Sequence, residues 1–466
     1  MVGSNDTWPS QSMLDKVRQR VVEMSGRDGE EVRFAVSPYR ICPLGAHIDH
    51  QGGTVTAMTI NHGILLGFVP SSDSQVYLQS GQFKGEVRIS VDEIQFPAHI
   101  AKSNGSNAAK DELEEAKWGN YVRGALYALQ KRGNHLKKGI TGFICGSEGL
   151  DSSGLSSSAA VGVAYLLAFE NANNLSISPT ENIEYDRIIE NEYFGLKNGI
   201  LDQSAILLSS RGCLTCINCK TREYKLIQPP KSKNHLKTEF ESAYKIMLAF
   251  SGLKQALTTT PGYNRRVAEC QEAARILLKA SRNEQEEPIL SDVTQEVYEA
   301  HKNKLETNLA KRAEHYFSEN KRVFKGLEEW ASGNIEEFGK LVTESGLSSI
   351  QNYECGLEEW ASGNIEEFGK LVTESGLSSI QNYECGCEPL IQLYETLLKA
   401  PGVYGARFSG AGFRGCCVAL VAAERAEEAA TFVRVEYSKL QPDLASHIKQ
   451  GKVVLVCDAG DSARII

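Results

Sequence analysis

Short apolar runs separated by glycine and polar turns fill the first 150 residues of the chain. Runs of about four to eight apolar residues are typical of strands, whereas apolar positions recurring at about every third or fourth residue indicate helices. The pattern predicts an opening helix at 11–25 and strands at 32–37, 54–60, 64–69, 76–80 and 86–90. It then predicts helices at 118–133, 156–172 and 181–195, with a strand at 139–145 between the first two.

A charged connection with two prolines, at 228–242, interrupts this pattern and marks the expected domain boundary. Beyond it come a strand at 244–250, a helix-rich region up to about residue 400, and strands at 415–422 and 452–457. A chain of 466 residues is longer than one hydrophobic core usually organises. We therefore expect an α+β protein with two domains, residues 1–240 and 241–466.

One segment occurs twice. GLEEWASGNIEEFGKLVTESGLSSIQNYEC occupies 326–355 and recurs letter for letter at 356–385. Repeat proteins need about three or more copies to bury a continuous core, and no third copy is visible. Two units that pack in different surroundings would demand different side chains, so a recent duplication or an error in the coding sequence is the better explanation. We expect one copy to dock in the second domain and the other to be an extra helical excursion away from the functional site.

The overall charge and the N-terminal sequence exclude several classes of protein. A net charge of −9 argues against general attraction to nucleic acid or to an anionic membrane, because either needs a dominant basic face. The opening MVGSNDTWPSQSMLDKV lacks the apolar core of a signal peptide, and no segment approaches the length of a membrane span. We expect a soluble cytoplasmic protein that binds neither nucleic acid nor membrane.

The twelve cysteines are scattered, and several lie inside apolar runs such as GCCVALVA. Reduced, buried thiols explain this distribution. Only GCLTCINCK, with Cys213, Cys216 and Cys219, has the spacing of a metal knuckle. In a strand, however, Cys213 and Cys219 would share one face and Cys216 the other, and no fourth ligand follows at a suitable interval. A metal at this segment is therefore not expected.

Two segments carry residues suited to chemistry. PLGAHIDHQGG, at 43–53, holds His47, Asp49 and His50, so it is a metal site, a substrate site or an ordinary loop. At 152–170, SSGLSSSAAVGVAYLLAFE places Gly154 and three serines directly before an apolar helix. A glycine and a helix N-terminus together favour anion binding, but serine is also a common helix cap. The local pattern alone leaves a phosphate cradle and a capped core helix both open.

Three motifs, which follow one another along the chain, together favour the phosphate cradle over the capped core helix. GLSSSA, at 154–159, resembles the phosphate-loop motif of the GHMP small-molecule kinases, which include galactokinase, homoserine kinase and mevalonate kinase. SPYRICPLGAHIDHQGG, at 37–53, resembles the galactokinase-type sugar motif, and GARFSGAGFRGCC, at 405–417, resembles the closing glycine-rich loop. The resemblance spans most of the chain. It implies an N-terminal domain like domain 2 of ribosomal protein S5, a ferredoxin-like C-terminal domain, and an active site in the cleft between them.

The same resemblance implies roles for individual residues. IIENEYFGLKNGILDQSAI matches the segment with the magnesium-binding glutamate, Glu190, and the catalytic aspartate, Asp202. Arg40 matches the arginine beside that aspartate, which would accept or orient the proton of the attacking hydroxyl. Mg²⁺ would be held by Glu190 and Ser158. Predicted ATP contacts are Trp118, Asn120, Gly154, Leu155, Ser156, Ser157 and Ser158, and predicted sugar contacts are Ala46, His47, Asp49 and Tyr263.

The substrate is inferred from one departure. Galactokinases read Gly-Glu-His-Thr-Asp-Tyr where this chain has Gly-Ala-His-Ile-Asp-His, so the acid that binds the C6 hydroxymethyl group is replaced by Ala46. An acid there would repel a carboxylate, and its loss favours a sugar oxidised at C6, D-galacturonate, phosphorylated at its anomeric hydroxyl. Candidates for binding the carboxylate are Tyr263, Thr259, Thr260 and Lys254. A neutral-sugar 1-kinase and a non-catalytic sugar sensor stay as alternatives.

Other departures concern the shape of the loops. Leu150 stands where the phosphate loop usually begins with proline, and Asp151 and two serines replace a glycine-rich entry. In the closing loop, Ala411 and Arg414 stand where galactokinases prefer glycine. The sequence is equally consistent with an Arg414 that contacts phosphate and with an Arg414 that is a surface residue.

Overall fold

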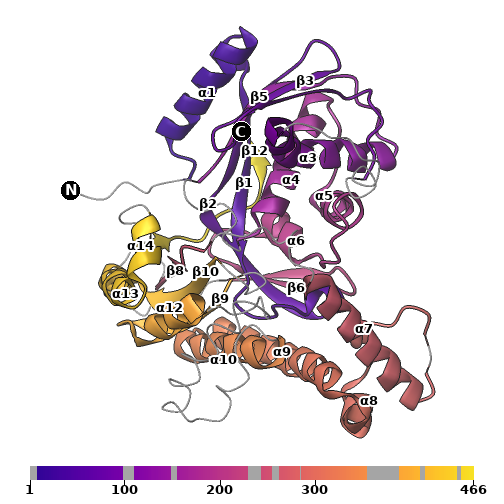
Figure 1. Ribbon diagram of the computed structural model, residues 1–466, viewed down its shortest axis with the longest axis vertical. Coiled ribbons are helices and arrows are strands. Elements are labelled where there is room, and N and C mark those ends of the chain that lie inside the picture. Colours follow the sequence, from indigo (N-terminus) through magenta and orange to yellow (C-terminus); the bar gives the residue numbers. More distant parts are fainter. Residues whose placement is uncertain are drawn as a thin grey trace.

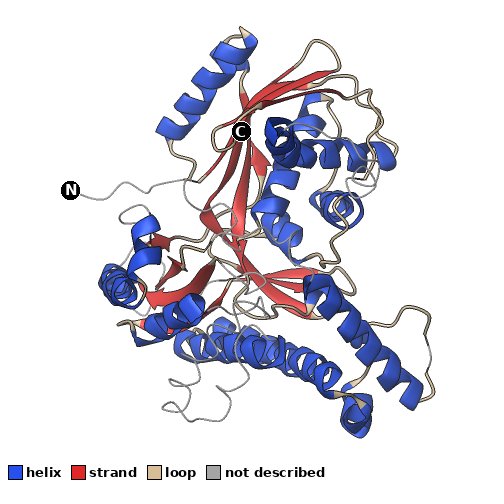
Figure 2. Ribbon diagram, viewed as in Figure 1, coloured by secondary structure: helices blue, strands red, loops and turns tan. Residues whose placement is uncertain are grey.

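The computed structural model of the chain describes residues 8–97, 110–147, 155–228, 243–253, 262–283, 285–353, 388–409, 415–448 and 453–466 (Figure 1). Within these ranges, two β-sheets are surrounded by helices, which Figure 2 distinguishes by colour. The first sheet has eight strands, with β12-β1-β2-β5-β3-β4 as its main path and β6 and β7 attached to β2. The second has four strands in the order β11-β8-β10-β9.

The first sheet and its helices come mainly from the first half of the chain. Its strands are β1 Arg33–Ile41, β2 Thr54–Pro70, β3 Gln75–Ser80, β4 Glu86–Ser90, β5 Ile140–Gly146, β6 Leu214–Asn218, β7 Tyr224–Ile227 and β12 Arg464–Ile465. Its helices are α1 Gln11–Ser25, α3 Lys110–Lys131, α4 Ser157–Ala172, α5 Pro179–Arg187 and α6 Leu201–Leu208. Short turns of 3-10 helix, η1 Gly29–Glu31 and η2 Asp49–Gln51, and a π-helix, η4 Ile188–Tyr193, complete this part.

Alternate residues of β1 pack against opposite layers. Phe34 and Val36 join Val17 and Val21 of α1, whereas Ala35 belongs to the larger core that includes α4. Successive strand side chains point to opposite faces, so a strand covered on both sides is apolar along its whole length. Accordingly, α1 lies on one face of the sheet and α3 to α6 lie on the other (Figure 1).

The second sheet begins directly after the proline-bearing connection. Its strands are β8 Tyr244–Phe250, β9 Val403–Phe408, β10 Cys416–Ala422 and β11 Val454–Cys457. The accompanying helices are α7 Gly262–Ala280, α8 Gln295–His301, α9 Thr307–Ser332, α10 Ile335–Tyr353, α12 Glu388–Lys399, α13 Ala426–Leu440 and α14 Pro442–His447, with short turns η6 Leu290–Asp292, η7 Lys302–Lys304 and η9 Ala423–Arg425. The final strand, β12, returns to pair with β1, so the chain crosses back to the first sheet. The division at residues 240 and 241 stays a proposal.

Two sequence predictions of local structure need correction. The strands expected at 54–60 and 64–69 are one continuous strand, β2. The stretch between them stays extended because a segment near the C-terminus pairs with it: the amide of Asn61 donates to the carbonyl oxygen of Asp458 at 2.9 Å, and Ile60 bridges Ala459. The pairing with β1 resumes at Gly63, which lies opposite Pro38. A side chain at Gly63 would lie 2.3 Å from the carbonyl oxygen of Ser37, so only glycine allows this approach. The helix expected at 181–195 is α5 followed by the π-helix η4.

The first copy of the repeat is packed into the protein. It forms the end of α9 and the whole of α10. Trp330 is fully buried against Tyr244 and Phe338, and its indole N–H donates to the carbonyl oxygen of Gln228 at 3.0 Å. The second copy lies outside the described residues. That it is an extra excursion stays a prediction.

Identical copies allow a matched test of this prediction. Trp330→Ala is expected to cost about 3–5 kcal/mol of stability, because it empties a buried site, whereas Trp360→Ala in the second copy is expected to change stability little. Thermal and chemical unfolding of the two variants would measure the difference. Large losses in both variants would contradict the prediction and show that both copies are packed, whereas small losses in both would contradict it by showing that either copy can occupy the docked position.

The described residues contain no helix long and apolar enough to cross a membrane. Nine cysteines fall in this part of the chain, and all are free thiols. Burial raises the pKa of Cys42 to about 12 and that of Cys145 to about 11, so these thiols are neutral and unreactive at neutral pH. Cys213, Cys216 and Cys219 lie in or beside β6, and no group of metal-ligating side chains forms there within the described ranges.

Candidate active site

Arg40 and Asp202 form a close ion pair between β1 and α6. Arg40 follows a shift in the pairing of β1 with β2, and such irregularities re-aim side chains beside functional sites. Its Nε and Nη2 atoms lie 2.7 and 2.6 Å from Oδ1 of Asp202, which stands in the first turn of α6. Burial lowers the pKa of the Arg40 guanidinium, but Asp202, together with Cys42 and Asp49, outweighs this effect, so that the pKa is raised. Both described contacts use Oδ1, and the Asp202 side chain is 22% exposed.

The loop at 43–53, here called the His47 loop, has a strained and specific shape. Gly45 has φ +94°, and a side chain there would lie 2.6 Å from Cα of Val55. His47 has φ 65°, which is uncommon for a residue with a side chain and typical of functional sites. Thr56 anchors the loop, because its hydroxyl oxygen accepts a hydrogen bond from the amide of Leu44 at 2.9 Å.

The loop carries Asp49 into the neighbourhood of Asp202. Burial, and then the nearby Asp202 charge, raises the pKa of Asp49 to about 6, although the amides of His50 and Leu201 donate hydrogen bonds that oppose the rise. Gly199 makes the approach possible, because a side chain there would lie 2.5 Å from Oδ2 of Asp49. Asp49, Asp202 and Arg40 therefore belong to one site.

Glu190 occupies the π-helix η4, a geometry frequently found at functional sites. Its carboxylate accepts a hydrogen bond from the side-chain amide of Asn198 and another from the hydroxyl of Ser158. Burial, and then the Asp202 charge, raises the pKa of Glu190 to about 7 despite these bonds. A cation between Glu190 and Asp202 would stabilise the ionised form of the Glu190 carboxyl, which burial and the Asp202 charge disfavour.

The serine segment leads into α4 without capping it. Ser156 has φ 58° and its side chain makes no capping bond, which is contrary to the capped-helix alternative. Its buried Oγ has no hydrogen-bond partner among the described residues. Ser157 and Ser158 follow as the first helical residues, where backbone N–H groups lack partners within the helix and favour an anion. Leu155 is fixed by its carbonyl oxygen, which accepts from the amide of Arg40 at 3.3 Å.

A second acid lies one helical turn from Glu190. Asp186 is fully buried, and neither carboxyl oxygen has a hydrogen-bond partner among the described residues. Burial, followed by the charges of Glu190 and Asp202, raises its pKa well above the ordinary value. Gly162 of α4 makes room for it, because a side chain there would lie 2.1 Å from Oδ1 of Asp186. The site is thus built on an excess of buried acid.

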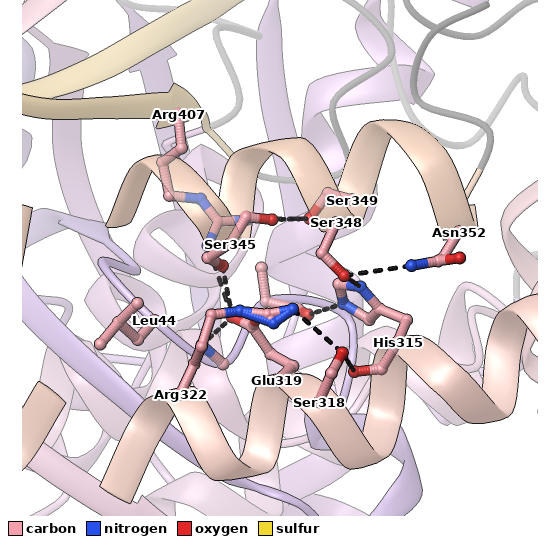
Figure 3. Close-up of polar contacts among 12 residues, drawn as sticks. Leu44, His315, Ser318, Glu319, Arg322, Ser345, Ser348, Ser349, Asn352 and Arg407 are labelled. Atoms are coloured by element: carbon pink, nitrogen blue, oxygen red, sulfur yellow. Dashed lines mark hydrogen bonds and ion pairs between the residues drawn. The ribbon is translucent and has the colours of Figure 1, made fainter. Parts of the chain in front are cut away.

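Side chains from α9 hold the His47 loop from behind (Figure 3). Nε2 of His315 donates to the carbonyl oxygen of Ala46 at 3.0 Å, and its Nδ1 lies 2.9 Å from the hydroxyl of Ser348. Glu319 accepts a hydrogen bond from the amide of Gly45 at 2.7 Å. Burial lowers the pKa of His315, so a neutral ring with its proton on Nε2 satisfies both contacts.

Arg407 of β9 completes this support. Its Nη1 donates to the carbonyl oxygen of Pro43 at 3.3 Å and to the hydroxyl of Ser345 at 2.5 Å, and its Nη2 donates to Ser349 at 3.3 Å. Ser345 also donates to Glu319, which lies 3.8 Å from Arg407. Because Ser345 and Ser349 belong to the first repeat copy, that copy supports the His47 loop through Arg407 (Figure 3).

The remaining predicted residues are placed in three different ways. Tyr263, at the start of α7, meets His50 edge to face with ring centroids 6.0 Å apart, and burial, then the Asp49 charge, raises its pKa. Trp118 is a buried core residue whose indole donates to the carbonyl oxygen of Lys84 at 3.3 Å, and Asn120 is half-buried on α3. Their nucleotide contacts stay predictions. Outside the described residues are Leu150, Asp151, Gly154, Lys254, Thr259, Thr260, Ala411 and Arg414.

Comparison with known proteins agrees with this geometry. The model of the GHMP kinase N-terminal domain matches residues 120–210, and the model of the GHMP kinase C-terminal region matches residues 356–439. The galacturonokinase of Arabidopsis thaliana is 61% identical over 460 residues, 99% of this chain and 100% of that protein. This chain belongs to the GHMP kinase family. It is therefore a phosphotransferase that uses ATP.

More distant GHMP kinases share the fold. A galactokinase of Lactococcus lactis subsp. lactis is 30% identical over 414 residues, which are 88% of each chain. The crystal structure of Lactococcus lactis galactokinase complexed with galactose superposes with a TM-score of 0.75 at 26% identity, covering 97% of this chain and 99% of that one. The mevalonate kinase of Methanococcus jannaschii superposes with a TM-score of 0.54 at 17% identity, covering 92% of this chain and 98% of that one. At this identity the likeness shows a shared fold and no more. The α+β GHMP kinase fold predicted from the motifs is confirmed.

Sequence reasoning missed the residues that support this GHMP kinase site from behind. His315, Glu319 and Arg407 lie more than 250 residues from the loop that they hold. No local pattern connects them with it. Asp186 had a weak signal, since it stands one helical turn before Glu190 on the same helical face.

Proposed function

We propose that this GHMP kinase transfers the γ-phosphoryl group of ATP to the anomeric hydroxyl of D-galacturonate. The observation that carries the proposal is Ala46, a small buried residue in the His47 loop, in a chain 61% identical to a galacturonokinase over its whole length. A galactokinase-type acid at this position would repel a C6 carboxylate. Ala46 removes both the repulsion and the bulk.

Arg40 and Asp202 are assigned to the chemical step. Asp202, whose Oδ1 is held by Arg40, would accept or orient the proton of the anomeric hydroxyl. Asp49 and Tyr263 lie beside this pair and would bind ring hydroxyls. Fixing the hydroxyl in line with the phosphoryl group supplies much of the catalysis in phosphoryl transfer.

The donor set around Glu190 fits Mg²⁺. One buried carboxylate and the Ser158 hydroxyl face each other, and Mg²⁺ is usually held by one or two carboxylates with water and phosphate oxygens supplying the rest. When bound, the ion would neutralise charge on the phosphates. The amides at the start of α4, with the free Oγ of Ser156, would hold the transferring phosphate.

The experiment that tests the function uses purified protein, Mg–ATP and four sugars in parallel: galacturonate, glucuronate, galactose and arabinose. We expect ADP formation to be fastest with galacturonate. Comparable turnover of galactose would identify a neutral-sugar kinase. Absence of turnover with all four sugars, despite binding of galacturonate, would identify a sugar sensor.

Ala46→Glu is expected to lower kcat/KM for galacturonate by about 100-fold or more. Two like charges about 5 Å apart at an effective dielectric constant of about 20 repel by about 3 kcal/mol, which corresponds to this factor. Ala46→Gln has nearly the same size without the charge, so it is the matched control and should lose much less. Equal losses in the two variants would show that space, not charge, sets the preference.

A further inference from the structure

Under the proposed function, on which this inference rests, the C6 carboxylate of the sugar lies beside Ala46. An oxygen atom that carries partial negative charge repels that carboxylate, whether it belongs to a side chain or to the backbone. The carbonyl oxygen of Ala46 is such an atom, since a carbonyl accepts hydrogen bonds and cannot donate them. The direction in which this carbonyl points therefore bears on which sugar is accepted.

His315 of α9 holds the carbonyl of Ala46. Its Nε2 atom lies 3.0 Å from the carbonyl oxygen, and both residues are buried. Burial lowers the pKa of His315, so the ring is neutral at neutral pH and has one proton to donate. Because a carbonyl oxygen only accepts, that proton is on Nε2.

A second contact fixes this tautomer. The other ring nitrogen of His315, Nδ1, lies 2.9 Å from the hydroxyl of Ser348 (Figure 3). The same hydroxyl oxygen accepts a hydrogen bond from the side-chain amide of Asn352 at 3.2 Å. The hydroxyl proton of Ser348 is then left to be donated to Nδ1, which keeps the proton of the ring on Nε2.

The hydrogen bond from His315 also determines the backbone of the next residue. The carbonyl of Ala46 and the amide of His47 belong to one planar peptide group, so holding the oxygen restricts φ of His47, which is 65°. This left-handed conformation is unfavourable for a residue with a side chain, by an amount similar to the contribution of one buried hydrogen bond. Without the donor, the peptide group is expected to turn over.

Other side chains hold the neighbouring peptide groups of the His47 loop. Glu319 accepts a hydrogen bond from the amide of Gly45 at 2.7 Å, and Arg407 donates to the carbonyl oxygen of Pro43 at 3.3 Å. Neither contact uses His315. A substitution of His315 therefore acts first on the one carbonyl group that its ring holds.

We propose that His315 is a positioning residue for the choice of sugar, because it keeps the carbonyl oxygen of Ala46 turned away from the C6 carboxylate. The side chain at position 46 lacks the acid, and His315 removes the backbone acceptor, so both eliminate repulsion of the same group. A carbonyl turned toward the sugar would repel a carboxylate, but it could accept a hydrogen bond from the C6 hydroxymethyl group of galactose. His315 thus favours galacturonate without touching either sugar.

Two substitutions of different length test this role. The amide nitrogen of glutamine can take the place of Nε2, whereas that of asparagine reaches only the place of Nδ1. His315→Asn is expected to raise KM for galacturonate about tenfold and to lower the galacturonate-to-galactose ratio of kcat/KM about tenfold, while kcat and KM for ATP change less than about threefold. His315→Gln should recover most of the loss. His135→Asn, the same change at an exposed histidine between α3 and β5, is the matched control and should leave both sugars unaffected.

Calorimetric binding of the two sugars without ATP gives the same comparison independently of chemistry. A purely structural role would lower the melting temperature and kcat of His315→Asn but leave KM for both sugars unchanged, and this result would overturn the inference. Equal rises in KM for the two sugars, or a glutamine variant no better than the asparagine variant, would also overturn it.

If His315→Asn does not fold, Ser348→Ala decides. This substitution keeps the ring of His315 but removes the donor to Nδ1, so part of the molecules adopt the other tautomer and the galacturonate-to-galactose ratio should fall about threefold. An unchanged ratio in folded Ser348→Ala would refute the inference. Failure of the wild-type protein to phosphorylate galacturonate would instead refute the proposed function.

Discussion

Replacing Asp202 with asparagine is expected to lower kcat by about 10³–10⁴-fold. The amide keeps the size of the carboxylate and can still accept a hydrogen bond from Arg40, but it cannot take up the proton of the attacking hydroxyl. General base catalysis contributes about 10²–10⁴-fold, and the loss of the negative charge beside a buried arginine adds to the effect. KM for the sugar should change far less than kcat, since Asp49 and Tyr263 would still bind it.

The same substitution leaves Arg40 buried beside a neutral group. Breaking a buried ion pair by removing one partner is strongly destabilising, so the melting temperature of Asp202→Asn should fall. Turnover must therefore be measured at low temperature, with circular dichroism to confirm the fold and calorimetry to confirm sugar binding. Asp458→Asn, which removes an exposed partner of Lys245, is the matched control and should be almost silent in both assays. A loss in kcat below about tenfold in folded Asp202→Asn would refute the assigned role.

The elements of the fold were predictable where periodic patterns are long. The predicted strand at 244–250 and the predicted helix at 11–25 coincide with β8 and α1, since each has an unbroken pattern between clear boundaries. The division of β2 was wrong because a glycine and polar residues ordinarily end a strand. Here residues 458–460, near the C-terminus, pair with the interruption, where Asn61 donates to the carbonyl oxygen of Asp458 and Ile60 bridges Ala459. Tertiary pairing, which a local pattern does not contain, decided the outcome.

The residues of the site were likewise predictable only in part. Arg40, Asp49, Glu190 and Asp202 were named because contiguous motifs carry them, and the structure places all four in one region. Helix α9 and strand β9, which support the His47 loop, lie more than 250 residues further along the chain, so no local pattern connects them with it. His315 lies outside the recognised motifs, and its hydrogen bond to the carbonyl oxygen of Ala46 exists only in the folded protein. Contiguous motifs identify the reacting groups, whereas packing reveals how they are oriented.

Glu190→Gln is expected to abolish most Mg²⁺-dependent turnover while stabilising the protein without ligands. The raised pKa, about 7, means that folded Glu190 binds its proton more tightly than unfolded Glu190 does. The cost to stability is therefore absent below the unfolded pKa, grows as the pH rises toward about 7, and is fully present above it. With a pKa raised from 4.5 to about 7, this cost at pH 8 is on the order of 3 kcal/mol. Glutamine avoids it because it carries no charge.

The pH dependence of magnesium binding follows from the same group. Ionised Glu190 is the form that would hold the ion, so protons compete below about pH 7, and apparent Mg²⁺ affinity should fall by about tenfold between pH 8 and pH 6. Magnesium titrations of ADP formation at pH 6 and pH 8 would measure this, and thermal unfolding of the ligand-free protein at the same pH values provides a readout independent of activity. Glu192→Gln, on the same π-helix and paired with Lys131, is the matched control. Two results would contradict the assignment of Glu190 as a magnesium-binding acid with a raised pKa: equal Mg²⁺ affinities at the two pH values, or a Glu190→Gln variant less stable than wild type at pH 8. Either result requires Glu190 to be stably ionised before the metal binds.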